Sequence, residues 1–254
     1  MNKRYCILEL KYSFGDFTQI LYPVVLFGER DTVLVDCGYP GSLRMLEEQL
    51  CLHNIAPESL TKLVLTHQDN DHMGAAAELR EKYPRIQILS SAIEEPYLSG
   101  KKKNLRLQQA EAMQEGLPEG QKAWGEQVCD RYRALKPVPV DVTLGRGDRF
   151  DWAGGCEILE TPGHTPGHIS IRSLSNDFLV TGDAAVWEEG KLAIANPQFC
   201  LDRENADKSL AEIQRYGCRE YICYHGEKYR KAPDSWEKIS GIRDFLNPQK
   251  GSRR

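Results

Sequence analysis

The chain has 254 residues, of which 41% are hydrophobic, and its formal net charge is −4. That apolar content is sufficient for a globular core, and so mild a charge gives no reason to expect nucleic acid or an anionic membrane as a partner. Glu9 and Lys11 interrupt the first apolar run, and no later stretch offers about 20 uninterrupted apolar residues, so neither a signal peptide nor a membrane-spanning helix is predicted. We expect a soluble, cytoplasmic protein that acts on a small-molecule substrate, with a homodimer left open as its assembly.

The eight cysteines are scattered along the chain and form no CxxC pair. Such spacing does not suggest a structural zinc site made of thiolates. In a cytoplasmic chain of this size, we expect the cysteines to be reduced, small, buried side chains.

The first third of the sequence alternates apolar runs with turns. Strands are predicted over residues 5–12, 19–27, 32–36 and 62–66. Leu43, Leu46 and Leu50 recur at helical spacing before Pro57, which predicts a helix between the last two of these strands. A second helix is predicted over residues 74–83 and another strand over residues 86–89.

Residues 99–139 differ from the rest of the chain because they are polar and rich in Gln, Glu and Lys. Helices are predicted over residues 105–115 and 122–135. The apolar side chains that this segment offers for packing are Leu105, Met113, Trp124 and Tyr132. We interpret the segment as a helical insertion that rests on a single domain spanning residues 1–254.

Strands return after the insertion, and they are expected over residues 140–143, 149–152, 156–161, 168–173, 177–183 and 220–224. A helix with Ala206, Leu210 and Ile213 on one face precedes the last strand, and a final helix is predicted around residues 239–246. Two groups of strands separated by an insertion fit two packed sheets with helices outside better than one parallel sheet.

Five of the six histidines fall into three short clusters, and each cluster follows an apolar strand. The clusters are "THQDNDH" with His67, Asp69, Asp71 and His72, "TPGHTPGH" with His164 and His168, and "CYHG" with His225. Asp183 follows another apolar strand in "TGD". Histidine and carboxylate together suit a first-row divalent ion, so the sequence predicts a metal site built at strand ends. The isolated His53 is interpreted as structural.

The spacing inside the first cluster fits two ions. Side chains alternate along an extended backbone, so His67, Asp69 and Asp71 project to one side, while His72 turns away as the chain bends into a helix. His67 and Asp69 are therefore expected to serve one ion, and Asp71 and His72 a second. The side chains expected to complete and bridge the two sites are His164, His225 and Asp183. Two ions about 3.5–4 Å apart that share a hydroxide are a common hydrolytic device.

Five motifs, in this order, resemble those of the metallo-β-lactamase superfamily over nearly the whole chain: "VDCG", "THQDNDH", "TPGHTPGH", "TGD" and "CYHG". The resemblance implies an α/β fold, the four-layer αββα sandwich. It also implies metal ligands at His67, Asp71, His72, His164, Asp183 and His225, with Asp36 and His168 as supporting residues. "GHTPGH" is similar to glyoxalase II, lactonases and their relatives, which hydrolyse thioesters, lactones and other esters.

Asp69 departs from the family pattern, which is usually HxHxDH and here is HxDxDH. Two divalent ions carry four positive charges, which Asp71 and Asp183 reduce to +2 and Asp69 to +1, so bound water should be less acidified than usual. A carboxylate is also a harder ligand than imidazole, which moves the two expected ions from zinc toward iron or manganese. The alternative is that Asp69 points to solvent and caps the following helix.

The leading hypothesis is a dinuclear metallohydrolase. A metal-bound hydroxide would attack the carbonyl of a small-molecule ester, thioester or lactone, and Asp71 would help to hold the nucleophile. Asp69 alone suggests a first alternative, an iron enzyme that acts on oxygen, nitric oxide or a persulfide. The second alternative is a non-catalytic ligand-binding relative. Retention of the other expected metal ligands argues against it. Residues 99–139 are expected to determine substrate choice, since insertions on rigid scaffolds commonly do.

Overall fold

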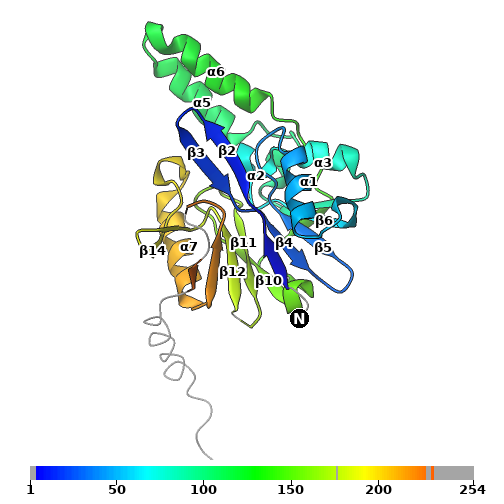
Figure 1. The fold of residues 1–254 in the computed structure, drawn as a ribbon. Coiled ribbons are helices and arrows are strands. Elements are labelled where there is room, and N and C mark those ends of the chain that lie inside the picture. Colours follow the sequence, from blue (N-terminus) through cyan, green and yellow to red (C-terminus); the bar gives the residue numbers. More distant parts are fainter. Residues whose placement is uncertain (1–3, 176, 227–229, 232–254) are drawn as a thin grey trace, which may run out of the picture.

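Two six-stranded sheets form the centre of the protein, whose computed structural model describes residues 4–175, 177–226 and 230–231. The first sheet consists, in spatial order, of β1 (Tyr5–Ile7), β4 (Val24–Phe27), β5 (Thr32–Val35), β6 (Lys62–Val64), β7 (Gln87–Ser91) and β8 (Val142–Leu144). The second consists of β16 (Arg230–Lys231), β15 (Glu220–Cys223), β12 (Phe178–Gly182), β11 (Ile169–Ser173), β10 (Cys156–Glu160) and β9 (Arg149–Phe150). Figure 1 shows the sheets between helices.

The helices of the described chain are α1 (Leu43–Leu52), α2 (Asn70–Met73), α3 (Ala76–Lys82), α4 (Glu95–Leu98), α5 (Leu105–Gly116), α6 (Lys122–Arg133) and α7 (Arg203–Arg215). Two small hairpins complete it, β2 (Leu10–Phe14) with β3 (Phe17–Leu21) and β13 (Val186–Glu188) with β14 (Lys191–Ala193). Short 3₁₀ turns lie at Pro57–Ser59, Glu119–Gln121, Trp152–Gly154 and Pro197–Phe199.

Both faces of each sheet are covered, so successive strand residues enter different apolar cores. Val33 and Val35 of β5 face the core between the sheets, whereas Leu34 faces the core under α1 and α3. On the other side, Ile213 of α7 packs with Leu179 of β12 in a third core. The four-layer αββα sandwich predicted from the sequence is thereby confirmed.

The carboxyl ends of the central strands meet at one edge of the sandwich. β5, β6, β7 and β8 run parallel in the first sheet, and β12 and β15 run parallel in the second. Residues that directly follow these strands are therefore brought close together, although they lie far apart in the sequence.

Several element boundaries differ from the sequence prediction. The predicted strand over residues 5–12 is divided between β1 and β2, which belong to different sheets, and the one over residues 19–27 is divided at Pro23, whose nitrogen carries no hydrogen for a ladder bond. The short helix α4 and the β13–β14 hairpin were not predicted. The helix expected around residues 239–246 lies outside the described residues.

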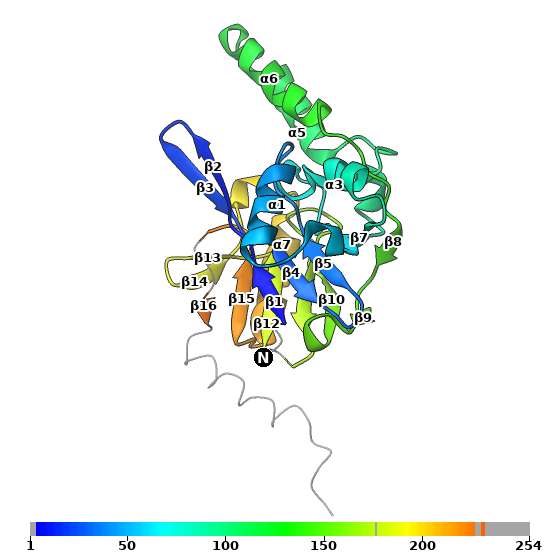
Figure 2. The same cartoon turned by 45° about the vertical axis from the view of Figure 1, so that its right-hand side comes forward.

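Helices α5 and α6 lie where the sequence predicts two helices, and the far end of this hairpin projects away from the sandwich (Figures 1 and 2). Met113 and Trp124 are 42% and 54% exposed, so the prediction that they pack on the main domain was wrong. Their side chains lie on the projecting part of the hairpin. The N-terminal end of α5 instead makes the contacts that matter for the site.

Six of the eight cysteines are buried, and none of the eight forms a disulfide. The prediction of burial fails for Cys51, which is exposed, and for Cys200, which is half-buried. Among the described residues, no helix is both long and apolar enough to cross a membrane.

Candidate metal centre

The predicted ligands converge at the common edge of the two sheets. His67 lies three residues beyond β6, Asp183 directly follows β12, and His225 lies two residues beyond β15. His164 comes from the loop between β10 and β11. The residues form overlapping groups whose ligand atoms lie within 4.8 Å of one another: His67, Asp69 and His164; His67, His72 and Asp183; and Asp71, His72 and His225.

The first position, as we call it, is formed by His67, Asp69, His164 and one oxygen of Asp183. Asp69 Oδ2 lies 3.4 Å from His67 Nε2 and 3.0 Å from His164 Nε2. His164 Nε2 lies 3.3 Å from Asp183 Oδ2. An ion bound tetrahedrally by bonds of about 2.0–2.1 Å separates neighbouring ligand atoms by about 3.3–3.4 Å, so the spacing suits an ion such as zinc.

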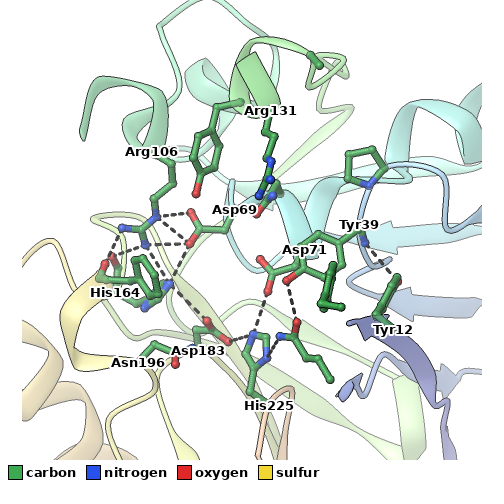
Figure 3. A pocket seen from close by; sticks show the side chains of 17 residues that line it. Tyr12, Tyr39, Asp69, Asp71, Arg106, Arg131, His164, Asp183, Asn196 and His225 are labelled. Carbon is green, nitrogen blue, oxygen red and sulfur yellow. Dashed lines mark hydrogen bonds and ion pairs between the residues drawn. The ribbon is translucent and has the colours of Figure 1, made fainter. Parts of the chain in front are cut away.

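The second position is formed by Asp71, His72, His225 and the other oxygen of Asp183. His225 Nε2 lies 3.1 Å from Asp71 Oδ2 and 3.4 Å from Asp183 Oδ1. His72 Nε2 lies 3.3 Å from the same Asp183 oxygen and 4.0 Å from Asp71 Oδ2. Asp183 therefore presents one oxygen to each position, and Figure 3 shows it between His164 and His225.

Several ligand atoms lack the hydrogen-bond partner that a buried polar atom normally has. They are His67 Nε2, His72 Nε2, His225 Nε2 and Asp183 Oδ1. Buried polar atoms left without partners are costly, and they commonly mark the place of an ion or water. Three of these atoms belong to the second position and His67 Nε2 belongs to the first. Imidazole nitrogens and carboxylate oxygens are suitable ligands for a divalent metal, so the donor atoms of both positions are chemically suited to such ions.

Asp36 holds His72 from behind. Its carboxylate accepts hydrogen bonds from the backbone N–H and the hydroxyl of Thr66, and lies 2.8 Å from His72 Nδ1. An Nδ1–H donated to this carboxylate leaves the Nε2 lone pair facing the second position. Asp36 itself adopts a φ of 58°, a conformation that Asp tolerates better than most residues.

His168 lies behind Asp183 and not among the ligand atoms. Its Nε2 accepts a hydrogen bond from the backbone N–H of Asp183 at 2.9 Å, and its Nδ1 lies 2.8 Å from the hydroxyl of Thr161. Burial, with His67 and His164 nearby, holds the pKa of His168 well below its usual range. A neutral imidazole that accepts through Nε2 therefore fixes the backbone from which Asp183 projects.

Arg106, which the sequence did not single out, forms an ion pair with Asp69. Its Nε lies 2.8 and 2.9 Å from the two Asp69 oxygens, and its Nη2 lies 2.8 Å from Oδ2 and 3.0 Å from His164 Nε2 (Figure 3). The Arg106 residue is only 3% exposed. Asp69 is buried too and makes no side-chain cap to α2, so the alternative of a solvent-facing helix cap was wrong.

Arg106 also changes the charge of the site. The sequence-based account left a charge of +1 for two divalent ions and three carboxylates, but the guanidinium raises it to +2. That is the charge expected for a site with a neutral histidine in place of Asp69. Arg106 therefore offsets the carboxylate, and the prediction of a less acidified water rested on an incomplete set of charges.

A polar network fixes the start of α5 to the loop that contains Gln68, between β6 and α2. Gln68 accepts a hydrogen bond from the Leu105 backbone N–H at the start of α5, and donates one to Glu94. Asn104 caps α5 by accepting from the backbone of Arg106, and its amide donates to the Gln68 carbonyl. These contacts place Arg106 against Asp69.

Charges within the centre oppose the effect of burial on its groups. Burial disfavours the Asp69 carboxylate, but His67 and Arg106 hold its pKa well below the usual range. Burial also disfavours a charged His164, yet Asp183 and Asp69 raise its pKa to about 10. Without an ion, His164 thus carries a proton that a bound ion would have to displace.

A cavity of about 760 Å³ opens above the centre. Asp69, Asp71, His164, Asp183 and His225 contribute to its lining, together with side chains from β2, β3, α5, α6 and residues 196–199. The volume is within the range of small-molecule sites. Reactive groups at the carboxyl ends of the strands are therefore accessible from one cavity.

Comparison with known proteins agrees with this arrangement. Residues 21–225 match the sequence profile of the metallo-β-lactamase superfamily. Probable metallo-hydrolase YflN of Bacillus subtilis (strain 168) is 27% identical over 205 residues, which is 76% of this chain and 75% of that protein. Hydroxyacylglutathione hydrolase GloC of Haemophilus influenzae is 29% identical over 157 residues, 61% of each. The metallo-β-lactamase family protein TTHA1429 of Thermus thermophilus superposes with a TM-score of 0.67 at 20% identity, over 95% of this chain and 80% of that one. The chain belongs to the metallo-β-lactamase superfamily.

Proposed function

We propose that the protein is a dinuclear hydrolase that cleaves an ester, thioester or lactone bond of a small molecule. The observation that carries the proposal is the pair of adjoining positions, joined by the two oxygens of Asp183. Ligand atoms lie 3.0–3.4 Å apart in the first position and 3.1–4.0 Å apart in the second. Similarity to a protein named hydroxyacylglutathione hydrolase supports an acyl substrate. Two bound ions would supply an activated water and polarise the carbonyl oxygen.

Residues of the chain would orient the attacking water and hold the metal ligands in place. Asp71 is the least buried of the three carboxylates and lines the cavity, so it can accept a hydrogen bond from the attacking water and hold it against the carbonyl. Asp36 and His168 keep His72 and Asp183 in place from behind. Burial of the remaining ligands excludes bulk water from the side opposite the cavity.

Iron-dependent redox chemistry is the second candidate. It is favoured by the oxygen ligand of Asp69, which is harder than the usual imidazole and suits iron or manganese. The Arg106 pair weakens this argument, because three hydrogen-bond contacts already draw negative charge away from the Asp69 oxygens. We therefore place hydrolysis first.

Metal analysis combined with an activity panel tests the proposal. Protein purified without added metal should carry close to two ions per chain, with His72→Ala losing mostly one and His164→Ala mostly the other. Metal-loaded protein should hydrolyse at least one class among esters, thioesters and lactones, with phosphodiesters as the non-acyl comparison, and a chelator should abolish the activity reversibly. Full metal content in both variants would contradict the two positions. Strong visible iron bands together with reduction of oxygen or nitric oxide, and no hydrolysis, would favour the second candidate.

A further inference from the structure

The cavity above the metal centre has an aromatic wall. Five aromatic side chains line it, contributed by β2, the loop after β5, α6 and the turn after residue 196: Tyr12, Phe14, Tyr39, Tyr132 and Phe199. Phe14 and Phe199 are 54% and 48% exposed. Large rings exposed beside a reactive centre favour a ligand whose apolar body covers them.

Among the described residues that line the cavity, one arginine has no carboxylate partner. Arg131 of α6 lines the cavity, and Figure 3 shows its side chain pointing toward Asp69 and Asp71. No hydrogen bond or ion pair joins it to another residue in the part of the chain that the structure describes. Arg106 and Arg133, the other arginines of the α5–α6 hairpin, both pair with carboxylates.

The carboxylates of the cavity have other uses. Asp69 is paired with Arg106, and Asp71 and Asp183 present their oxygens to the metal positions. Once ions neutralise those two carboxylates, nothing in the described cavity offsets Arg131. Its planar guanidinium matches the geometry of a carboxylate better than that of a spherical anion.

We propose that the substrate is an anionic acyl compound whose carboxylate binds Arg131, whose apolar body lies against the aromatic wall, and whose reactive carbonyl lies over the metal centre. The identity of the reactive bond rests on the proposed function. The recognition of a carboxylate by Arg131 does not, so the two can be tested separately.

Calorimetry on the metal-loaded protein tests recognition without turnover. The probes are 4-phenylbutyrate and its neutral amide, 4-phenylbutyramide, which differ mainly in charge. The wild type should bind the acid about tenfold more tightly, the size of one charge-assisted contact at a partly exposed site. Arg131→Gln should lose this preference and Arg131→Lys should retain part of it. Arg133→Gln, two residues along the same helix and outside the cavity lining, is the matched control and should keep it. A preference that persists in Arg131→Gln would mean that the ions hold the carboxylate, and would overturn the inference.

Kinetics with a matched pair of esters separates this inference from the proposed function. For mono-4-nitrophenyl glutarate and the neutral 4-nitrophenyl pentanoate, the ratio of kcat/KM values should fall about tenfold in Arg131→Gln, mainly through KM for the anionic ester. Hydrolysis of both esters with an unchanged ratio overturns the anion site and leaves the hydrolase standing. If no ester, thioester or lactone of the activity panel is cleaved while the acid–amide preference still depends on Arg131, the hydrolase proposal fails and the anion site stands.

Discussion

Replacing Arg106 by methionine should destabilise the protein strongly when no ion is bound and much less when ions are bound. The change keeps the length and apolar stem of the side chain but removes the guanidinium that contacts both oxygens of Asp69. Breaking a buried ion pair by deleting one partner typically costs about 3–5 kcal/mol, because the other charge stays buried and uncompensated. Both Arg106 and Asp69 are buried, so we expect the free energy of unfolding of the ion-free protein to decrease by an amount in that range.

A divalent ion in the first position would take over the compensation of Asp69. The loss should then shrink, and by thermodynamic linkage the difference between the two losses must appear as tighter ion binding in the variant. A difference of about 2 kcal/mol corresponds to about a 30-fold gain in affinity. Arg106 would thus lower affinity at the first position while stabilising the empty site.

Urea unfolding with and without zinc, together with calorimetric zinc titration, measures both quantities. The matched control is Arg80→Met, which breaks a two-pronged pair with Asp141 outside the cavity lining and should cost the same with and without zinc. The double variant Asp69→Asn/Arg106→Met should be at least about 2 kcal/mol more stable than the sum of its single changes predicts. Equal losses with and without zinc, an unchanged zinc affinity and additive single changes would refute the linkage between Arg106 and the ion.

Three further predictions concern proton release at His164, the backbone at Gly182 and the replacement of Asp69. Since the pKa of His164 is raised to about 10, zinc binding at pH 7 should release a proton from it. The zinc affinity should then fall about tenfold per pH unit on acidification for each proton released. Calorimetric titrations in two buffers of different ionisation enthalpy count those protons, and a count of zero would contradict the prediction. Gly182→Ala should lower the free energy of unfolding by about 2–3 kcal/mol and reduce the content of both ions, because φ at this position is +53° and the new Cβ would lie 2.6 Å from His168 Nε2. The control is Gly190→Ala, where φ is +76° and the new Cβ meets open space. It should cost about 1 kcal/mol and leave the metal content intact. Asp69→His should not simply restore the usual motif, because it leaves Arg106 buried without a carboxylate, and it should destabilise the ion-free protein by about 3 kcal/mol in urea unfolding. Adding Arg106→Met should recover most of that loss. If Asp69→His is as stable as the wild type, Arg106 does not need the carboxylate.

The sequence predicted those parts of the site that depend on local patterns. Apolar strands that end in a polar residue are visible in the sequence, and parallel strands bring their carboxyl ends to one edge. His67, Asp183 and His225 are therefore placed together by the same pattern that forms the sheets. The four layers followed for the same reason, because two groups of strands with apolar residues on both faces need covering on both sides.

The residues that escaped prediction depend on tertiary placement. Arg106 lies in a polar helix, where an arginine is ordinarily solvent-exposed, and its partner Asp69 is 37 residues away in the sequence. Glu94 likewise supports the loops around the metal centre through tertiary contacts, since its carboxylate accepts hydrogen bonds from Gln68 and from the backbone of Gly167. Neither contact leaves a periodic trace in the sequence. The split of the first predicted strand has the same origin, since the apolar run continues while the pairing partner changes.

The α5–α6 hairpin contributes two arginines to the cavity, and by our proposal they link substrate choice to the metal centre. Arg106 near the start of α5 compensates Asp69, and Arg131 near the end of α6 remains available in the cavity. Removing the whole segment over residues 99–139 would consequently do more than change specificity, because it would also leave Asp69 buried without its partner. A deletion that tests substrate choice alone therefore needs Asp69 replaced by a neutral ligand at the same time. A departure from the usual motif and an added helical hairpin, which look independent in the sequence, are two halves of one electrostatic arrangement.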